Sequence, residues 1–188
     1  AVFGDRRLKM LDVGCGTGWH VKALAQHGHD VCGIDSAEKQ VLWANANDPL
    51  GTITRGDLLS IPYEDDTFDV SYTINALHHL SSFEEQKVAL GELARVTKRD
   101  GLVIVHEMNT RNPVIRLYLN YIFPRLRSID EGEGIEQWIL PSRWQQVENF
   151  ALKKITYFTF IPDFTPRFLF PLFRLLESFL ERTPLDPW

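Results

Sequence analysis

The 188-residue sequence has little cysteine, little net charge and no long apolar run. Its two cysteines, Cys15 and Cys32, are too few for a disulfide framework, and no spacing of Cys or His is typical of a metal site. The formal net charge is −5 and the basic residues are scattered, which argues against binding to nucleic acid or anionic membranes. The sequence shows no signal-peptide pattern and no run able to span a bilayer. We expect a reducing, cytoplasmic setting, without a metal, a nucleic-acid partner or stable membrane insertion.

Apolar strand-like runs alternate with helix-like stretches in the first half of the chain. The expected strands are residues 9–13, 29–35, 51–57, 67–75 and 102–107. The expected helices are residues 18–27, 36–47 and 82–95. This alternation predicts an α/β fold with a Rossmann-like, doubly wound, mostly parallel sheet and helices on both faces.

Turn and capping residues set the expected boundaries of these elements. Gly28 should end the first helix, and Ser36 is the expected N-cap of the second. Ser82 and Glu85 have the spacing of a capping box for the third helix. A turn at 98–101 should then lead into the fifth strand.

The rest of the chain differs from this core. Residues 109–140 are aromatic, locally basic and then acidic, and they are too long for an ordinary connection. They are either a surface excursion or a substrate lid, and we favour a lid because they leave the sheet at a carboxyl end. Residues 141–188 should add a helix, an edge strand and an amphipathic tail. We therefore expect one domain over 1–188, with residues 1–108 as its cofactor-binding core.

The tail has apolar residues at helical spacing and a polar face of mixed charge. Membrane-surface helices are usually rich in Lys and Arg, so this helix is expected to pack on the domain or on a second copy, giving a homo-oligomer. Neighbouring phenylalanines leave weak membrane contact or a lipid-like substrate open as alternatives.

The segment LDVGCGTGWH places Gly14, Gly16 and Gly18 directly after the first expected strand. A glycine turn between a strand and a helix brings a ligand against bare backbone, with the first helix amides facing it. A dinucleotide fingerprint would need glycine where Trp19 stands, and no Lys-Ser or Lys-Thr pair follows for a phosphate loop. The turn therefore predicts a ligand that is not held by a diphosphate.

Three aspartates accompany this turn. Asp12 would repel a phosphate and attract an ammonium or sulfonium group. Asp35 ends the second strand and suits both hydroxyls of a ribose, although it would also serve to cap the next helix. Asp57 ends the third strand and is either an acceptor for an exocyclic adenine amine or a turn residue. Together they predict an adenosine ligand that is cationic at its far end.

These motifs resemble the class I S-adenosylmethionine-dependent methyltransferase family. LDVGCGTG is similar to its glycine signature, CGID to its ribose acid, and GDLLSIPYEDDTFDVSYTINALHHL to its third and fourth strands. The resemblance runs from Met10 to Glu107, with a weaker continuation to Phe160. It is to the small-molecule branch, methyltransferase type 11, which is related to quinone-biosynthesis C-methyltransferases. It implies S-adenosyl-L-methionine as cofactor and methyl transfer to O, N or C of a small-molecule acceptor.

By this resemblance the cofactor is held at the carboxyl edge of the sheet. Asp12 would lie near its amino group, Asp35 would hold the ribose, and Asn75 would sit beside its methionine portion. Asp57 and Leu58 would border the adenine. The cofactor-binding residues implied are Asp12, Gly14, Cys15, Gly16, Thr17, Gly18, Asp35, Ser36, Asp57, Leu58 and Asn75.

The candidate catalytic groups are His79 and Glu107, which follow the fourth and fifth strands and suit removal of a proton from the acceptor. Glu107 is otherwise a strand-terminating acid. His78 is a candidate substrate residue, but HHL equally suits one His that caps the loop and one that packs beneath it. Arg111 and Tyr118 in the insert suit an apolar or aromatic acceptor with an anionic group.

The sequence departs from the resembling fold at both ends. That fold normally has a helix before the glycine strand and a seventh strand after the sixth, so we expect the natural protein to be longer than this truncated sequence. Two other functions stay open: a non-catalytic binding module that keeps the fold, and a nicotinamide-dependent oxidoreductase, which Trp19 and Asp12 disfavour.

Overall fold

The computed structural model describes residues 5–47 and 52–108, together with residues 121, 151, 153–156, 167–172 and 175. By its internal contacts the chain divides into two compact units, Ala1–Glu107 with Gly134–Phe150, and Met108–Glu133 with Ala151–Trp188. Arg111 and Tyr118 lie outside the described residues, as does the helix expected at 141–150. The organisation of the chain as a single domain with a lid therefore stays a prediction.

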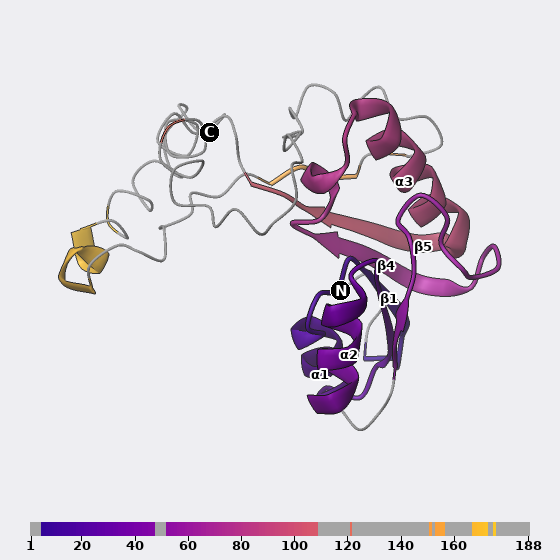
Figure 1. Ribbon diagram of the computed structural model, residues 1–188, viewed down its shortest axis with the longest axis horizontal. Coiled ribbons are helices and arrows are strands. Elements are labelled where there is room, and N and C mark those ends of the chain that lie inside the picture. The colour runs from indigo at the N-terminus through magenta and orange to yellow at the C-terminus, as the bar shows by residue number, and fades with distance from the viewer. Residues whose placement is uncertain are drawn as a thin grey trace. The chain divides into compact units, whose positions relative to one another are not determined.

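The first unit is built on a five-stranded sheet in which every pair of neighbours is parallel (Figure 1). The strand order is β3-β2-β1-β4-β5. The chain therefore adds β2 and β3 on one side of β1 and then crosses over to add β4 and β5 on the other side of β1. Ligands of such sheets bind beyond the carboxyl ends of the strands where this order reverses, which here lies between β1 and β4. The strands are β1 (Lys9–Val13), β2 (Asp30–Asp35), β3 (Ile53–Arg55), β4 (Phe68–Ile74) and β5 (Thr97–His106).

Helices cover both faces of the sheet, which confirms the α/β fold expected from the sequence. α1 (Trp19–Gln26) and α2 (Glu38–Asn47) lie on one face, and α3 (Phe83–Val96) lies on the other (Figure 1). The short 3-10 helix η1 (Leu77–His79) connects β4 to α3.

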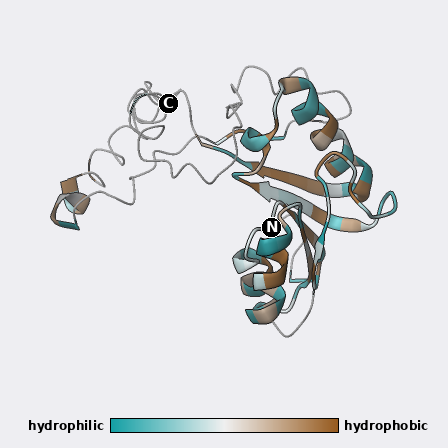
Figure 2. Cartoon of the chain, viewed as in Figure 1, coloured by the Kyte–Doolittle hydropathy of each residue, from teal (hydrophilic) through white to brown (hydrophobic). Residues whose placement is uncertain are grey.

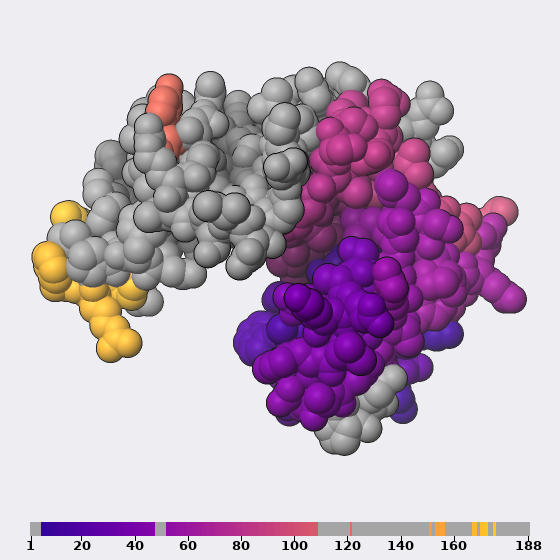
Figure 3. Space-filling view, viewed as in Figure 1, coloured from indigo at the N-terminus to yellow at the C-terminus, as the bar shows by residue number. Residues whose placement is uncertain are grey.

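Buried apolar side chains form one cluster on each face of the sheet. Leu11 and Leu93 belong to the α3 side, whereas Met10 and Val21 belong to the side of α1 and α2. The strands are accordingly the most apolar part of this unit (Figure 2), and the residues from β1 to β5 fill space as one continuous body (Figure 3). With both faces occupied, the carboxyl edge of the sheet is the place left for a ligand.

β5 begins earlier than the sequence predicted. We expected a turn over residues 98–101 and a strand from Leu102, but pairing with β4 already starts at Thr97. The Thr97 hydroxyl lies 2.8 Å from the Ser71 hydroxyl and 2.6 Å from the Leu93 carbonyl, which fixes this residue between β4 and α3. The register with β4 then shifts, so residues 98–101 form a bulge within the strand instead of a turn before it.

The second unit is described at a few positions. Residues 167–169 form a 3-10 helix, and residues 170–172 and 175 are helical. Residues 153–156, the start of an expected edge strand, have no regular secondary structure. Among the described residues, no helix combines the length and the apolar character needed to cross a membrane.

The N-terminus of α3 is capped as the sequence predicted, with one change of partner. The Ser82 hydroxyl accepts from the Glu85 amide at 3.2 Å. The Glu85 carboxylate in turn accepts from the amide and the hydroxyl of Ser81, at 2.9 and 2.8 Å, where a standard capping box would use the Ser82 amide.

We predict that Ser82→Ala lowers the free energy of unfolding by about 1 kcal/mol, because it removes the acceptor of an otherwise unpaired helix amide. Urea denaturation measures this change. Ser36→Ala is the matched control, because in the described part of the chain the Ser36 side chain has no hydrogen bond, and it should change stability by less than about 0.5 kcal/mol. Equal losses in the two variants would contradict the assigned cap.

Candidate functional site

The glycine turn after β1 is held against β2 by backbone hydrogen bonds. The amides of Gly14 and Cys15 both donate to the Ile34 carbonyl, at 2.8 and 3.0 Å, and the Gly18 amide donates to the Cys15 carbonyl at 2.9 Å. Gly14, Gly16 and Gly18 have φ angles of 76°, 53° and 74°. These angles lie in the left-handed region that glycine adopts without steric cost, so the motif specifies the shape of the turn.

The three glycines are needed for different reasons. A side chain on Gly14 would meet Cβ of Ala76, and one on Gly18 would meet Cδ1 of Ile53 in the core. A Cβ on Gly16 would have no atom within 4 Å. Gly14 and Gly18 therefore allow the protein to pack on itself, whereas Gly16 presents backbone to open space, where a ligand can approach.

Asp35 connects this turn to the chain after β2. Its Oδ2 accepts from the Gly16 amide at 2.7 Å, and its Oδ1 accepts from the Ala37 amide at 2.9 Å. The N-cap expected at Ser36 is therefore not used, and α2 begins at Glu38 after a turn closed by Asp35. A carboxylate oxygen accepts more than one hydrogen bond, so Asp35 keeps capacity for the two hydroxyls of a ribose.

Asp12 is only 2% exposed and pairs in the sheet register with Tyr72 of β4. Among the described residues, neither Asp12 Oδ2 nor the Tyr72 hydroxyl has a hydrogen-bond partner. Burial raises the pKa of Asp12 to about 7, while the nearby Tyr72 hydroxyl lowers it and the Asp35 carboxylate raises it to a smaller extent. The Tyr72 hydroxyl is near enough to lower the Asp12 pKa but does not meet hydrogen-bond geometry, so the buried Oδ2 is incompletely satisfied. Such a group is costly unless something completes it, and an ammonium group of a ligand fits that requirement.

The remaining residues of the turn carry no reactive group. Burial, followed by the charges of Asp12 and Asp35, raises the pKa of the Cys15 thiol to about 12, and that thiol lies 3.9 Å from the Gly16 carbonyl. Thr17 is exposed. Within residues 5–47, 52–108 and the other described positions, no three His, Cys, Asp or Glu side chains are grouped to hold a metal ion.

Asp57 and Leu58 form a turn at the end of β3. Oδ1 of Asp57 accepts from the Leu59 amide at 2.9 Å, and the Asp57 carbonyl accepts from the Ser60 amide at 3.2 Å. Asp57 is exposed, whereas Leu58 is buried, with its Cδ1 3.6 Å from where a Cβ of Gly14 would lie. The structure thus places this turn, which we call the 57–60 turn, directly beside the glycine turn.

Asn75 ends β4 in a conformation unusual for a residue with a side chain. Its φ is 52°, and its amide donates to the His106 carbonyl at 2.9 Å. Asn tolerates the left-handed region better than most residues, and such strain gathers at functional sites. The next residue, Ala76, is the one that packs against Gly14.

Glu107 holds the chain that follows β4. Its Oε1 accepts from the Leu77 amide at 2.8 Å, and its Oε2 lies 2.7 Å from Nδ1 of His78. The side chains of His78 and Glu107 are each 6% exposed, whereas His79 is exposed and its ring lies 4.2 Å from that of His78. Of these three side chains, His79 is therefore the one that solvent or an acceptor reaches.

Sequence reasoning missed Tyr72 and the side chains that hold residues 61–65 in place. Tyr72 lies beside Asp12 because β1 pairs with β4, and no local sequence pattern predicts that pairing. Glu92 and Arg95 are three residues apart on α3, a spacing typical of an ion pair on a helix surface. This spacing does not indicate that both side chains also bind a loop distant in the sequence.

Comparison with known proteins places the chain among methyltransferases. Residues 11–105 match the family model described as methyltransferase domain. The chain is 37% identical over 97 residues to malonyl-[acyl-carrier protein] O-methyltransferase of Erwinia pyrifoliae, covering 52% of this chain and 36% of that enzyme. It is 30% identical over 155 residues to demethylmenaquinone methyltransferase of Tropheryma whipplei, covering 76% of this chain and 62% of that enzyme. The chain thus spans less than two thirds of either relative.

A solved structure supports the same fold. The YcgJ protein from Bacillus subtilis superimposes with a TM-score of 0.57 at 28% sequence identity, over 75% of this chain and 59% of that one.

We predict that Gly14→Ala destabilises the ligand-free protein more than Gly16→Ala, because of the two only Gly14 is packed against another part of the protein. Gly14→Ala should lower the free energy of unfolding by about 2–4 kcal/mol for two reasons: alanine is strained in the left-handed backbone conformation, and its Cβ would clash with Cβ of Ala76. Gly16→Ala should cost only about 1 kcal/mol, the strain of its left-handed backbone. Urea denaturation without ligand tests this, and equal losses would contradict this difference in packing.

The raised pKa of Asp12 predicts a pH-dependent cost in the ligand-free protein. The unfolded chain releases this proton near pH 3.8 and the folded chain only near pH 7, so the contribution of Asp12 to stability falls as the pH rises through that window. Asp12→Asn should therefore stabilise the ligand-free protein by a few kcal/mol at pH 8, roughly 1.4 kcal/mol for each pH unit of the window, and by much less at pH 4. Urea denaturation at both pH values measures the difference.

Asp100→Asn, at an exposed position in the β5 bulge, is the control for this comparison. A stabilisation by Asp12→Asn that is the same at pH 4 and pH 8 would contradict the buried, ionising carboxyl.

Proposed function

The chain belongs to the methyltransferase domain family, and from this we propose that it transfers a methyl group from S-adenosyl-L-methionine to a small-molecule acceptor. The observation that carries the proposal is the buried Asp12 carboxyl with an unpartnered oxygen, next to a glycine turn that opens at Gly16. Acid and open backbone together favour a ligand that is cationic and approaches the main chain. The alternatives, an oxidoreductase or a non-catalytic module, have no comparable support.

In this proposal each loop at the carboxyl edge holds one part of the cofactor. Asp12 accepts a hydrogen bond from its ammonium group, and Asp35 accepts from its ribose hydroxyls. Asp57 accepts from the adenine amine, with Leu58 against the ring. Asn75 borders the methionine portion. The register of β1 with β2 and β4 supports this assignment, because it brings the loops after these strands to one edge.

The chain's part in the reaction is mainly alignment. Bound S-adenosyl-L-methionine would supply an electrophilic methyl group on a sulfonium. Orientation of two reactants corresponds to effective molarities of about 10⁵–10⁸ M, so the protein can accelerate the transfer by holding the acceptor in line.

We propose His79 as the group that takes a proton from an acidic acceptor. Its exposure at the carboxyl edge supports this role. The Glu107 carboxylate already accepts from the Leu77 amide and lies against His78, which favours a positioning role for both Glu107 and His78 over direct proton transfer or substrate contact.

The acceptor that we propose is an apolar or aromatic small molecule with an anionic group. The names of two relatives are consistent with this acceptor chemistry, since one is a methyltransferase of malonyl-[acyl-carrier protein] and the other of demethylmenaquinone. Arg111 and Tyr118 are the proposed contacts. A cytoplasmic setting is supported by the free Cys15 and Cys32, and a homo-oligomer by the exposed Leu172 and Leu175 of the tail.

We predict that Asp35→Ala weakens binding of S-adenosylmethionine at least about tenfold, because it removes the ribose acceptor and the anchor of Gly16. Isothermal titration calorimetry measures the dissociation constant. His27→Ala is the control: His27 lies at the opposite end of α1, with its ring on the Ala23 carbonyl, and its loss should leave affinity unchanged.

Equal affinities in these two variants would contradict the role of Asp35. If the wild-type chain bound a nicotinamide dinucleotide and not S-adenosylmethionine, the proposed function itself would be wrong.

A further inference from the structure

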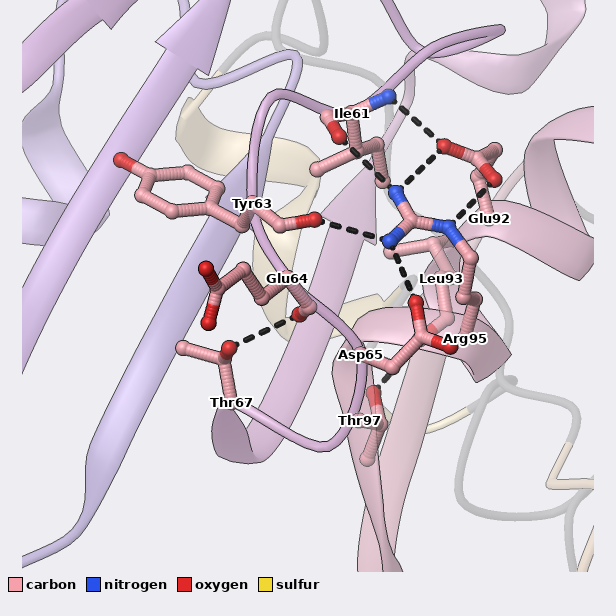
Figure 4. A network of polar contacts seen from close by, with 9 residues as sticks. All are labelled: Ile61, Tyr63, Glu64, Asp65, Thr67, Glu92, Leu93, Arg95 and Thr97. Atoms are coloured by element: carbon pink, nitrogen blue, oxygen red, sulfur yellow. Dashed lines mark hydrogen bonds and ion pairs between the residues drawn. The ribbon is translucent and has the colours of Figure 1, made fainter.

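Arg95, at the C-terminal end of α3, uses all five of its N–H groups on fixed partners (Figure 4). Nε and one Nη2 hydrogen go to the Glu92 carboxylate, at 2.7 and 2.8 Å. The other Nη2 hydrogen goes to the Ile61 carbonyl at 2.9 Å. Nη1 donates to the Tyr63 carbonyl and to the Asp65 carboxylate, both at 2.8 Å. Two of these five bonds therefore go to backbone carbonyls of the connection from β3 to β4.

Glu92 completes the attachment from the same helix. Its Oε2 also accepts from the Ile61 amide at 2.9 Å. Both backbone polar groups of Ile61 are thus bound to α3, the amide to Glu92 and the carbonyl to Arg95 (Figure 4). The carbonyl also accepts from the Tyr63 amide at 2.8 Å. We call this arrangement of Glu92 and Arg95 the α3 clamp.

The residue that the α3 clamp holds, Ile61, directly follows the 57–60 turn. Ser60, whose amide closes that turn on the Asp57 carbonyl, is followed directly by Ile61. Leu58 and Ile61 are both buried in the core cluster on the α3 side. A rigid Ile61 therefore fixes the end of the turn, while its buried Leu58 fixes the middle beside Gly14.

Both members of the ion pair at the centre of the clamp are held in their charged forms. The hydrogen bonds that Arg95 donates hold the pKa of Glu92 below its ordinary value, and the Glu92 carboxylate that accepts them raises the pKa of Arg95. Lysine cannot replace this arginine, because an ammonium has three donors and no planar fork.

We propose that the α3 clamp positions the 57–60 turn for recognition of the adenine amine, so that Arg95 sets base specificity without touching the ligand. This inference rests on the proposed function. Asp57 is exposed and has one carboxylate oxygen engaged by its own turn, so its direction depends on the backbone that carries it. A residue that holds such a turn in place keeps the side chain that contacts the ligand in its productive geometry.

The test compares two ligands that differ only at the 6-position and the neighbouring N1 of the purine. S-adenosylhomocysteine carries a 6-amino group and an N1 acceptor, whereas S-inosylhomocysteine carries an N1–H and a 6-oxo group, which cannot donate to Asp57. Calorimetry on the wild-type chain should show tighter binding of the first. In Arg95→Lys, binding of S-adenosylhomocysteine should weaken about tenfold, the effect of one misaligned hydrogen bond to a charged group, while S-inosylhomocysteine binds as before.

Asp69→Asn is the matched control for lost stability. Asp69 accepts from the Lys9 amide, Arg6 and Lys98 near the amino end of β4, so its replacement also removes ion pairs from the same sheet, away from the site. It should lower the melting temperature and leave the preference between the two ligands intact. If Arg95→Lys does not fold, Asp65→Ala, which removes one exposed acceptor of Arg95, takes its place in the same comparison.

A double-mutant cycle identifies the route of the effect. In an Asp57→Ala background the preference should already be lost, and adding Arg95→Lys should not weaken binding of S-adenosylhomocysteine further. Additive losses, or equal weakening of both ligands by Arg95→Lys, would overturn the inference and leave the clamp a stabilising contact only. Wild-type binding to both ligands without preference would also overturn it. Failure of the wild type to bind either ligand would instead count against the proposed function.

Discussion

The Gly16 amide donates to the Asp35 carboxylate at 2.7 Å, and this bond joins the loops that follow β1 and β2. Three glycines of the turn have a left-handed backbone and no side chain, so the shape of the turn depends strongly on the groups that receive its amides. Asp35 receives one of them and also closes the turn into α2 through Ala37. A single carboxylate therefore sets the open backbone at Gly16 and the start of the next helix, and the rest of the site is arranged around that geometry.

Three described loops at the carboxyl edge of the sheet have a charged side chain as an anchor. Asp35 holds the glycine turn, the Glu92–Arg95 pair holds the segment after the 57–60 turn, and Glu107 holds η1 through Leu77. The last two anchors come from elements distant in the sequence, with separations of 34 and 30 residues. These hydrogen bonds tie the loops to α3 and to the strand ends, as a site built on loops requires.

The strands and the glycine turn could be predicted from the sequence because their signals are local. Buried parallel strands are short apolar runs, and the spacing of Gly14, Gly16 and Gly18 requires an unusual backbone. The predicted start of β5 was wrong because the residues at 98–101 have the composition of a turn, although Thr97 is already fixed by partners in β4 and α3. The Asp12–Tyr72 pair, the ties of Glu107 and the α3 clamp could not be predicted, because each depends on strand order or on a contact between distant segments.

Cys15 stands inside the glycine turn with its thiol against the Gly16 carbonyl. Thiolates are strong nucleophiles and thiols are weak ones, so a sulfur beside a methylating agent is a hazard to its own protein. Burial and the charges of Asp12 and Asp35 raise the Cys15 pKa to about 12, so the sulfur keeps its proton at neutral pH. Asp12 and Asp35, the acids that would attract a positively charged ligand, would thus also protect the Cys15 thiol from being alkylated by it.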